Sequence, residues 1–357
     1  MEQYTNITQM LELMHCGAFC VKDGIIIAAN EAAKRNLITE GLRVKELLLT
    51  GVREYPLLKD GCLNLTLKAS GRTFGATITR MADFDVFVLE QDPAHPELQA
   101  LALAAQELRT PLANIMAMAE ELLPRQDTDG ADYAGQLNRS LFRLQRIIGN
   151  MSDAYRYSSE CTPLFEIRDI CALLEEYFAR NAQLLSHAEI YLHFETLSDK
   201  IFTLVDTEKL ERAVNNILSN AAKYTPKGGT IEAKLTRQGT MLYLTVQDGG
   251  TGTSPGLRGT LFDRYLRQPS IEDPHHGIGL GMVLIRSVAA IHGGAVLLEQ
   301  SPQRGMRLTL SLEICQDTNV FVHSTPLRVD YAGERDHSLI ELSEILPPSL
   351  YGKEKTK

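Results

Sequence analysis

The strongest constraint on the fold is a regular spacing of apolar residues near the middle of the chain. In the segment 98–122 they recur in alternating steps of three and four, at Leu98, Leu101, Ala105, Leu108, Leu112, Ile115, Ala119 and Leu122. A second segment repeats the pattern at Leu137, Leu141, Leu144, Ile148 and Met151. This spacing places apolar side chains on one stripe of a helix. Because two such helices cannot bury their stripes alone, the pattern predicts a hairpin that dimerises into a four-helix bundle.

Composition limits the classes of protein that this sequence can represent. A chain of 357 residues with 44% hydrophobic content is long enough for two or three domains with separate cores. The formal net charge of -9 argues against nucleic-acid binding, which needs a clustered positive field. The first residues show no basic segment followed by an apolar core, and no apolar run approaches the ~18 to 20 residues that a bilayer requires. We therefore expect a cytoplasmic protein without a membrane span.

The first 92 residues alternate short apolar runs with turn signals. The pattern predicts a hairpin of strands at 18–21 and 25–28, a helix that starts near Asn30, and three antiparallel strands at 63–68, 72–79 and 85–89. This order, with Asp23-Gly24 ahead of Asn30, resembles a small PAS sensor domain. The resemblance implies that residues 1–92 serve in sensing or dimerisation.

From residue 163 to residue 315 the pattern changes to mixed helix and strand. Helices are predicted at 167–185, 207–224 and 278–291, and strands at 189–194, 201–204, 230–235, 241–247, 295–300 and 306–312. This order predicts a layer of helices on one face of a mixed sheet. The remaining segment, 316–357, has two possible strands at 320–323 and 327–331 and a possible short helix at 339–346, and no function is assigned to it.

The predicted helix 207–224 carries polar residues that suit a metal-bound polyphosphate. Asn216, Asn220 and Lys223 stand at positions i, i+4 and i+7, which places two amides and an ammonium on one face. An amide oxygen can enter a magnesium shell that phosphate oxygens and water otherwise fill. A lysine offers a point charge to the phosphates.

Two glycine-rich segments follow this helix. Asp248 ends a predicted strand, and Gly249, Gly250 and Gly252 then let the backbone approach a flat ligand while the carboxylate accepts a hydrogen bond from an adenine amino group. Downstream, the run 277–281 reads Gly-Ile-Gly-Leu-Gly and precedes a helix whose free N–H donors can bind phosphate.

Together these segments are similar to the N box, the Asp-x-Gly-x-Gly box and the Gly-x-Gly-x-Gly box of the histidine-kinase ATP domain, the Bergerat (GHKL, HATPase_c) fold. Residues 261–265, Leu-Phe-Asp-Arg-Tyr, match the intervening F box. The resemblance implies that ATP and Mg²⁺ bind here. It implies that Asn220 holds Mg²⁺, that Asn216 and Lys223 face the phosphates, that Tyr224 flanks the nucleotide and that Asp248 reads adenine. The pocket and its lid would then include Gly250, Gly252, Phe262, Gly277, Gly279, Leu280 and Gly281.

In gyrase-like relatives of this fold a glutamate at the position of Asn216 activates water. An amide cannot act as a general base, so the resemblance implies a pocket that binds ATP without hydrolysing it quickly.

The segment that starts at Gln106 reads Gln-Glu-Leu-Arg-Thr-Pro and resembles the H box of sensor histidine kinases, where a histidine takes the phosphoryl group from ATP. Gln106 occupies the position of that histidine. The lone pair of its amide nitrogen is delocalised into the carbonyl, so Gln106 should not accept phosphate. Glu107 corresponds to the residue that helps to activate the histidine, and Thr110 resembles the family's water-positioning residue.

We therefore expect an α+β multidomain protein with four parts. These are a PAS-like α/β domain at 1–92, a two-helix dimerisation hairpin of the HisKA type at 97–160, a Bergerat-fold α/β sandwich at 163–315, and an unassigned extension at 316–357.

The expected function is that of a cytoplasmic histidine-kinase-like protein of two-component signal transduction that binds Mg-ATP and is degenerate for autophosphorylation. One alternative is a phosphatase that uses Thr110 on a phosphorylated response regulator. Another is an active kinase whose histidine was lost by mutation or which acts in trans. The expected partners are a second copy of the chain, through residues 97–160, and a response regulator receiver domain or a partner kinase.

Overall fold

The structure is a computed structural model of the chain. It describes residues 7, 11, 12, 14, 16–59, 61–81, 83–90, 104, 105, 107–109, 112, 113, 115, 116, 128–158, 163–250, 280–301, 305–315 and 336–351, with the side chains of 128–133 and 154–158 left aside. The F-box match at 261–265 and the first part of the glycine run, 277–279, lie outside these residues.

The N-terminal unit, residues 16–90, is a five-stranded antiparallel sheet with short helices. Its strands are β1 (Ala18–Lys22), β2 (Ile25–Ala29), β3 (Gly61–Ala69), β4 (Arg72–Arg80) and β5 (Asp85–Leu89), in the order β2-β1-β5-β4-β3. Asn30 caps the helix α2 (Glu31–Lys34) by accepting from the N–H of Ala33, and two 3-10 turns follow at Val44–Glu46 and Tyr55–Leu57. All the elements predicted from residue 18 to residue 89 are present, while the assignment to the PAS class stays a prediction.

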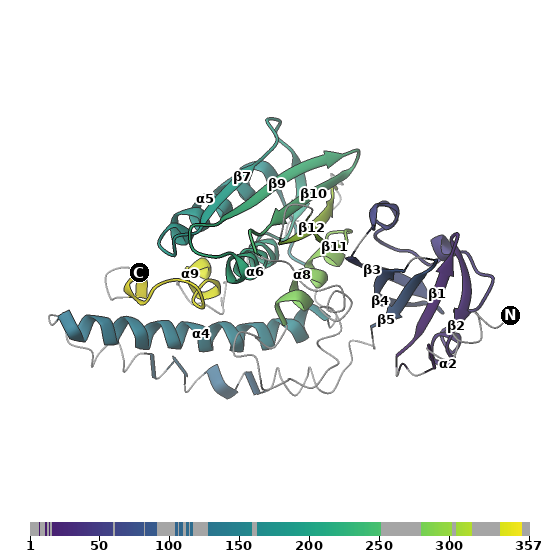
Figure 1. Ribbon diagram of the computed structural model, residues 1–357, viewed down its shortest axis with the longest axis horizontal. Helices are drawn as coiled ribbons and strands as arrows, with labels where there is room; N and C mark the ends of the chain where they lie inside the picture. Colours follow the sequence, from purple (N-terminus) through teal and green to yellow (C-terminus); the bar gives the residue numbers. More distant parts are fainter. Residues whose placement is uncertain are drawn as a thin grey trace.

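The helix α4 (Thr128–Ser158) runs along one side of the molecule in Figure 1. It begins at Thr128, so its first turns include the acidic segment 128–132, ahead of the predicted apolar stripe. The first turn of a helix tolerates the acidic residues of this segment because they face the positive end of the helix dipole. Of the predicted apolar stripe, Leu141, Ile148 and Met151 are buried in this chain, whereas Leu137 and Leu144 are 41% and 48% exposed.

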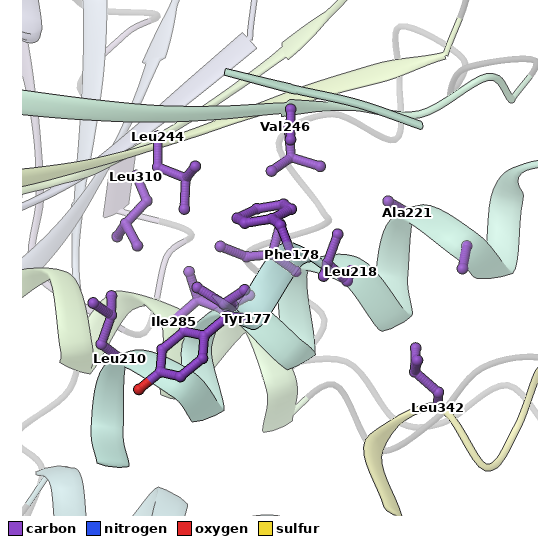
Figure 2. Packing of buried hydrophobic residues seen from close by; sticks show 14 of the residues in the cluster. Tyr177, Phe178, Leu210, Leu218, Ala221, Leu244, Val246, Ile285, Leu310 and Leu342 are labelled. Carbon is purple, nitrogen blue, oxygen red and sulfur yellow. The ribbon is translucent and has the colours of Figure 1, made fainter. Parts of the chain in front are cut away.

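Residues 163–315 contain the predicted helix layer on a mixed sheet. The helices α5 (Ile170–Ser186), α6 (Thr207–Tyr224) and α8 (Leu280–Ile291) cover one face of β7 (Tyr191–Glu195), β9 (Thr230–Gln238), β10 (Met241–Gln247), β11 (Val296–Gln300) and β12 (Met306–Glu313) (Figure 1). Their apolar side chains meet those of the sheet, as Phe178, Leu218 and Val246 do in Figure 2. The arrangement confirms the predicted α+β class.

One helix in this unit is shorter than its amphipathic pattern predicts. Residues 166–169 form the strand β6 (Glu166–Asp169), which pairs with β8 (Phe202–Val205), and α5 starts only at Ile170. The carboxylate of Asp169 accepts from the N–H groups of Cys171 and Ile201, so the same residue caps the helix and closes the strand pair. Ile167 therefore lies in a strand and not in a helix.

The N-terminal unit and the ATP-domain-like unit share one sheet. Strand β3 pairs antiparallel with β11, from Asn64 opposite Val296 to Gly61 opposite Glu299. The result is a ten-stranded sheet in the order β2-β1-β5-β4-β3-β11-β12-β10-β9-β7, which is visible as a continuous layer across Figure 1. The sequence analysis predicts two separate domains and does not foresee this connection, which we call the sheet joint.

The end of the chain is folded back between α4 and α6 (Figure 1). Residues 336–351, which we call the strap, contain the helix α9 (His337–Glu341) and a 3-10 turn at Pro348–Tyr351. The predicted helix at 339–346 is thus shorter and starts earlier, with Asp336 as its cap. The predicted strands at 320–323 and 327–331 lie outside the described residues.

Within the part of the chain that the structure describes, no helix combines the length and the apolar character that crossing a bilayer would need.

Candidate functional site

The helix α6 carries Asn216, Asn220, Lys223 and Tyr224 of the predicted site and is fixed at both ends. At its start the carboxylate of Asp206 accepts from the N–H of Lys209 at 3.1 Å and also pairs with the Lys209 ammonium. At its end the hydroxyl of Thr225 donates to the carbonyl of Ala221 and accepts from the N–H of Gly249 at 3.2 Å. The C-terminal end of α6 is therefore joined to the loop that follows Asp248.

The amides of α6 are directed toward the start of α8. Nδ2 of Asn216 donates to the carbonyl of Arg212 at 2.9 Å, and a methyl group placed on Gly281 would lie 2.7 Å from the Asn216 Oδ1. One turn later, Nδ2 of Asn220 lies 4.0 Å from Sδ of Met282. Any residue larger than glycine at position 281 would displace Asn216, so this glycine is needed for the close approach of the two helices.

Asp248 is held at the end of β10 by backbone donors. Its Oδ1 accepts from the N–H of Gly250 at 2.9 Å and from the N–H of Met306 at 3.2 Å, and the carboxylate is buried. Both of these bonds end on Oδ1 of the carboxylate.

Burial is also the main influence on the charge of this carboxylate. It raises the pKa of Asp248 above its ordinary value of 3.8, and the N–H groups of Gly250 and Met306 oppose the rise. A carboxylate kept partly desolvated in this way forms strong hydrogen bonds with a donor that reaches it.

Glycines surround Asp248 on both sides of the sheet edge. A methyl group on Gly250 would lie 2.6 Å from the carbonyl oxygen of Tyr224, and one on Gly305 would lie 2.4 Å from Oδ1 of Asp248. Gly305 also has a positive φ of 80°. The sequence analysis predicts Gly250 and misses Gly305, because Gly305 comes from a turn between β11 and β12 that is distant in the chain.

The structure thus brings Asn216, Asn220, Asp248, Gly250, Leu280 and Gly281 onto adjoining elements. Lys223 is partly buried at the last turn of α6, and the side chain of Tyr224 is exposed. Glu107 is exposed in a helical stretch at 107–109. Gln106, Thr110, Gly252, Phe262, Gly277 and Gly279 lie outside the described residues.

Three buried polar residues of this unit escape the sequence analysis. Arg212 and Asn215 lie on α6, and His292 follows α8. Nδ1 of His292 lies 2.8 Å from the carbonyl oxygen of Val288, while its Nε2 accepts from the N–H of Asp206 at 3.1 Å. Burial lowers the pKa of His292, which favours the neutral ring that this pair of bonds requires. The only sequence signal for Arg212 and Asn215 is their spacing of three on a helix.

Two protein families match this chain. Residues 97–160 match HisKA, the His Kinase A (phospho-acceptor) domain, and residues 205–316 match HATPase_c, the histidine kinase-, DNA gyrase B- and HSP90-like ATPases. The first match covers the predicted hairpin, and the second covers α6, Asp248 and α8.

Similar proteins include named histidine kinases. Sensor histidine kinase RppB of Synechocystis is 29% identical over 224 residues, which are 60% of this chain and 49% of that protein. Sensor-like histidine kinase SenX3 of Mycolicibacterium smegmatis is 25% identical over 238 residues, which are 64% of this chain and 62% of that protein. The chain therefore spans less than two-thirds of the length of either relative.

Among solved structures, full-length ShkA in complex with AMPPNP superposes with a TM-score of 0.51 at 22% identity, over 61% of this chain and 46% of that chain. At this identity the likeness concerns the fold alone. The fold, the two family matches and the relatives agree: the chain belongs to the sensor histidine kinase family, with a HisKA region and a HATPase_c domain.

Proposed function

We propose that this protein binds Mg-ATP in its HATPase_c domain and acts in two-component signalling as a degenerate histidine kinase that does not phosphorylate itself. The observation that carries the proposal is a contrast within one chain. Asp248, α6 and the start of α8 lie on adjoining elements with glycines at their close approaches, whereas position 106 of the phospho-acceptor region is a glutamine.

The proposed nucleotide contacts follow from the donors and acceptors present. Oδ2 of Asp248 accepts from the adenine amino group, and the glycines beside it allow the ring to approach. Lys223 and the first N–H groups of α8 face the phosphates. The ShkA structure, which shares this fold, is a complex with AMPPNP, and this supports nucleotide binding here.

The magnesium site is proposed at Asn220. The residues fit this ion, because Asn220 is only partly buried and its nitrogen lies against the sulfur of Met282, which leaves the amide oxygen as the ligand. Mg²⁺ would neutralise phosphate charge there. Asn216 supplies no general base, which supports slow hydrolysis.

The partners are proposed from exposed apolar side chains on the helices of 97–160. Leu108 and Ile115 are 48% and 51% exposed, and on α4 Leu137, Leu144 and Ile147 are exposed as well. Burial of these apolar side chains against a second copy of the chain would be energetically favourable, which supports a homodimer built as a four-helix bundle. A receiver domain or a partner kinase would bind this dimer. The N-terminal unit would serve as its PAS-like sensor or dimerisation domain.

The first test concerns nucleotide binding. Asp248→Asn keeps the shape and the bonds from Gly250 and Met306 but presents an N–H group to the adenine amine. We expect ATP affinity in the presence of Mg²⁺, measured by calorimetry, to fall by about 10- to 100-fold. Asp83→Asn, at an exposed turn of the N-terminal unit, is the matched control and should bind like the parent. Equal affinity of all three proteins would show that the pocket is misassigned.

The second test concerns phosphoryl transfer. Incubation with labelled ATP should give no acid-labile phosphoprotein, and Gln106→His should restore labelling because imidazole provides the missing lone pair. Labelling of the unchanged protein would contradict the degenerate assignment. Thr110-dependent release of phosphate from a phosphorylated regulator would favour the phosphatase alternative.

A further inference from the structure

The strap is an integral part of the packed core. Its apolar residues Leu339, Ile340, Leu342, Leu346, Leu350 and Tyr351 are all buried. Against α4, Tyr351 stacks edge-on with Phe142 at 5.1 Å between ring centroids, and the Tyr351 carbonyl accepts from Nδ2 of Asn138 at 2.9 Å. Arg139 donates to the carbonyls of Ser343 and Glu344.

A buried charge cluster joins the strap to both α4 and α6. The Arg212 guanidinium on α6 is fully buried and pairs with Glu341 of the strap and with Asp153 of α4. The other oxygen of Glu341 binds Nε of Arg146 on α4 at 3.1 Å. Glu341 therefore bridges the two helices. Ser219 adds a bond from α6 to the Glu341 carbonyl at 3.0 Å.

The helix α6 therefore presents one face to the strap and another to the nucleotide site. Arg212, Asn215 and Ser219 face the strap, and Asn216 and Asn220 face the start of α8. The two faces are directly linked, because the carbonyl of Arg212 accepts from the side chain of Asn216.

The two faces meet at Lys223. A pocket of about 520 Å³ lies at the end of α6, and its lining includes Lys223 and Lys227 together with Arg143 of α4 and Glu344 of the strap. Glu344 binds Nη1 of Arg146 at 2.9 Å and lies 3.5 Å from Arg143. Burial opposes its charge, yet Arg146, Lys223 and Arg143 hold the pKa of Glu344 below its ordinary value. Glu344 thus lines the same pocket as Lys223, the cation that the nucleotide phosphates are proposed to use.

We propose that the strap regulates the ATP site, with Glu344 and the nucleotide phosphates competing for Lys223, so that ATP binding weakens the hold of the strap on α6. This inference rests on the proposed function, since it assumes that ATP occupies the site. The two effects are thermodynamically linked. If bound ATP weakens the interaction of Glu344 with Lys223 by a given factor, removal of the Glu344 charge strengthens ATP binding by the same factor.

The experiment is a double-mutant cycle on the full chain, with Glu344→Gln, Lys223→Met and the double variant, and with Mg-ATP affinity as the readout. Gln keeps the size of Glu344 and removes its charge. We expect Glu344→Gln to bind ATP about two- to fivefold more tightly, the range expected when one negative charge is removed from a partly exposed site. In the Lys223→Met background the same change should have no effect. Glu232→Gln, at an exposed position of β9, is the matched charge control and should bind like the parent.

Hydrogen exchange of the strap supplies a second readout. Saturating Mg-ATP should speed exchange in a peptide that covers 336–351 and leave the strands β10 and β12 protected. A purely structural strap predicts no tightening in Glu344→Gln and no response of the strap to ATP, and that result overturns the inference. Tightening that persists in Lys223→Met also overturns it. If the unchanged protein does not bind ATP at all, both this inference and the proposed function are overturned. If it binds ATP but the variants behave as a structural strap predicts, only this inference is overturned.

Discussion

The ATP-binding unit is held on two sides by contacts of different chemistry. At the sheet joint, β3 and β11 exchange main-chain hydrogen bonds, and Ala295 and Leu297 pack into the core of the N-terminal unit. At the strap, the attachment to α4 and α6 depends on side chains, above all on the buried charges of Arg212 and Glu341.

The two attachments differ in their capacity to respond to a signal. Main-chain pairing depends on strand shape and is insensitive to the charge of the side chains, and at the sheet joint it is supplemented by one ion pair between Glu90 and Arg286. Buried ion pairs are stable only while every partner is charged and in place. We therefore expect the sheet joint to be a permanent connection and the strap to be the releasable one.

Arg212→Met should have the largest effect, because it leaves Asp153 and Glu341 buried without their shared cation. We expect the free energy of unfolding to fall by about 3 to 5 kcal/mol in urea denaturation followed by circular dichroism. Arg237→Met, at the exposed end of β9, is the control and should change little. A loss below about 1 kcal/mol would mean that the buried cluster is not the main attachment of the strap.

Gly61→Ala tests the sheet joint. Gly61 has a φ of 147°, and a methyl group on it would lie 2.0 Å from the carbonyl oxygen of Leu298 in β11. We expect a loss of about 3 kcal/mol, with faster hydrogen exchange in β3 and β11. Gly71→Ala is a matched control, since Gly71 also has a positive φ but has no atom within 4 Å of the added methyl group, and it should cost about 1 kcal/mol. Similar losses for the two variants would show that backbone strain, and not the strand contact, determines the result.

The smallest expected effect is a dependence of the free energy of unfolding on acidic pH. Because cations lower the folded-state pKa of Glu344, its stabilising contribution is present above the ordinary value of 4.5 and is lost as the pH falls through the lower folded value. Glu344→Gln should therefore reduce the free energy of unfolding by about 1 kcal/mol near neutral pH, and this difference should vanish near pH 3. A difference that is independent of pH would contradict the role of the Glu344 charge at the strap.

Much of the fold was predictable where the determining interactions are local. The bounds of α6 and β10 agree with the predicted 207–224 and 241–247, because Asp206 caps the helix and alternating apolar residues define the strand. The predicted start of α5 was wrong because the helical spacing of apolar residues continues through Ile167. Only the distant strand β8 decides that residues 166–169 are extended.

The candidate site divides in the same way. The residues of α6 and the position of Asp248 were predictable from spacing, and they come together as expected on adjoining elements. Gly305, His292 and Arg212 were not, because each depends on a partner that lies far away in the chain. Asp248 is 57 residues before Gly305, Asp206 is 86 residues before His292, and Glu341 is 129 residues after Arg212. Local periodicity contains no information about such pairs.

Residue identity and short spacings are enough to recognise the two helical stripes, the family boxes around Asn216 and Asp248, and the glutamine at position 106, because the covalent chain fixes them directly. Folding in three dimensions was needed to show that β3 continues the sheet of the ATP-binding unit and that the strap places Glu341 between Arg146 and Arg212. The physical reason is that strand edges and buried charges are satisfied by whichever distant groups folding brings to them, and a buried cation such as Arg212 is stable only where its acids arrive.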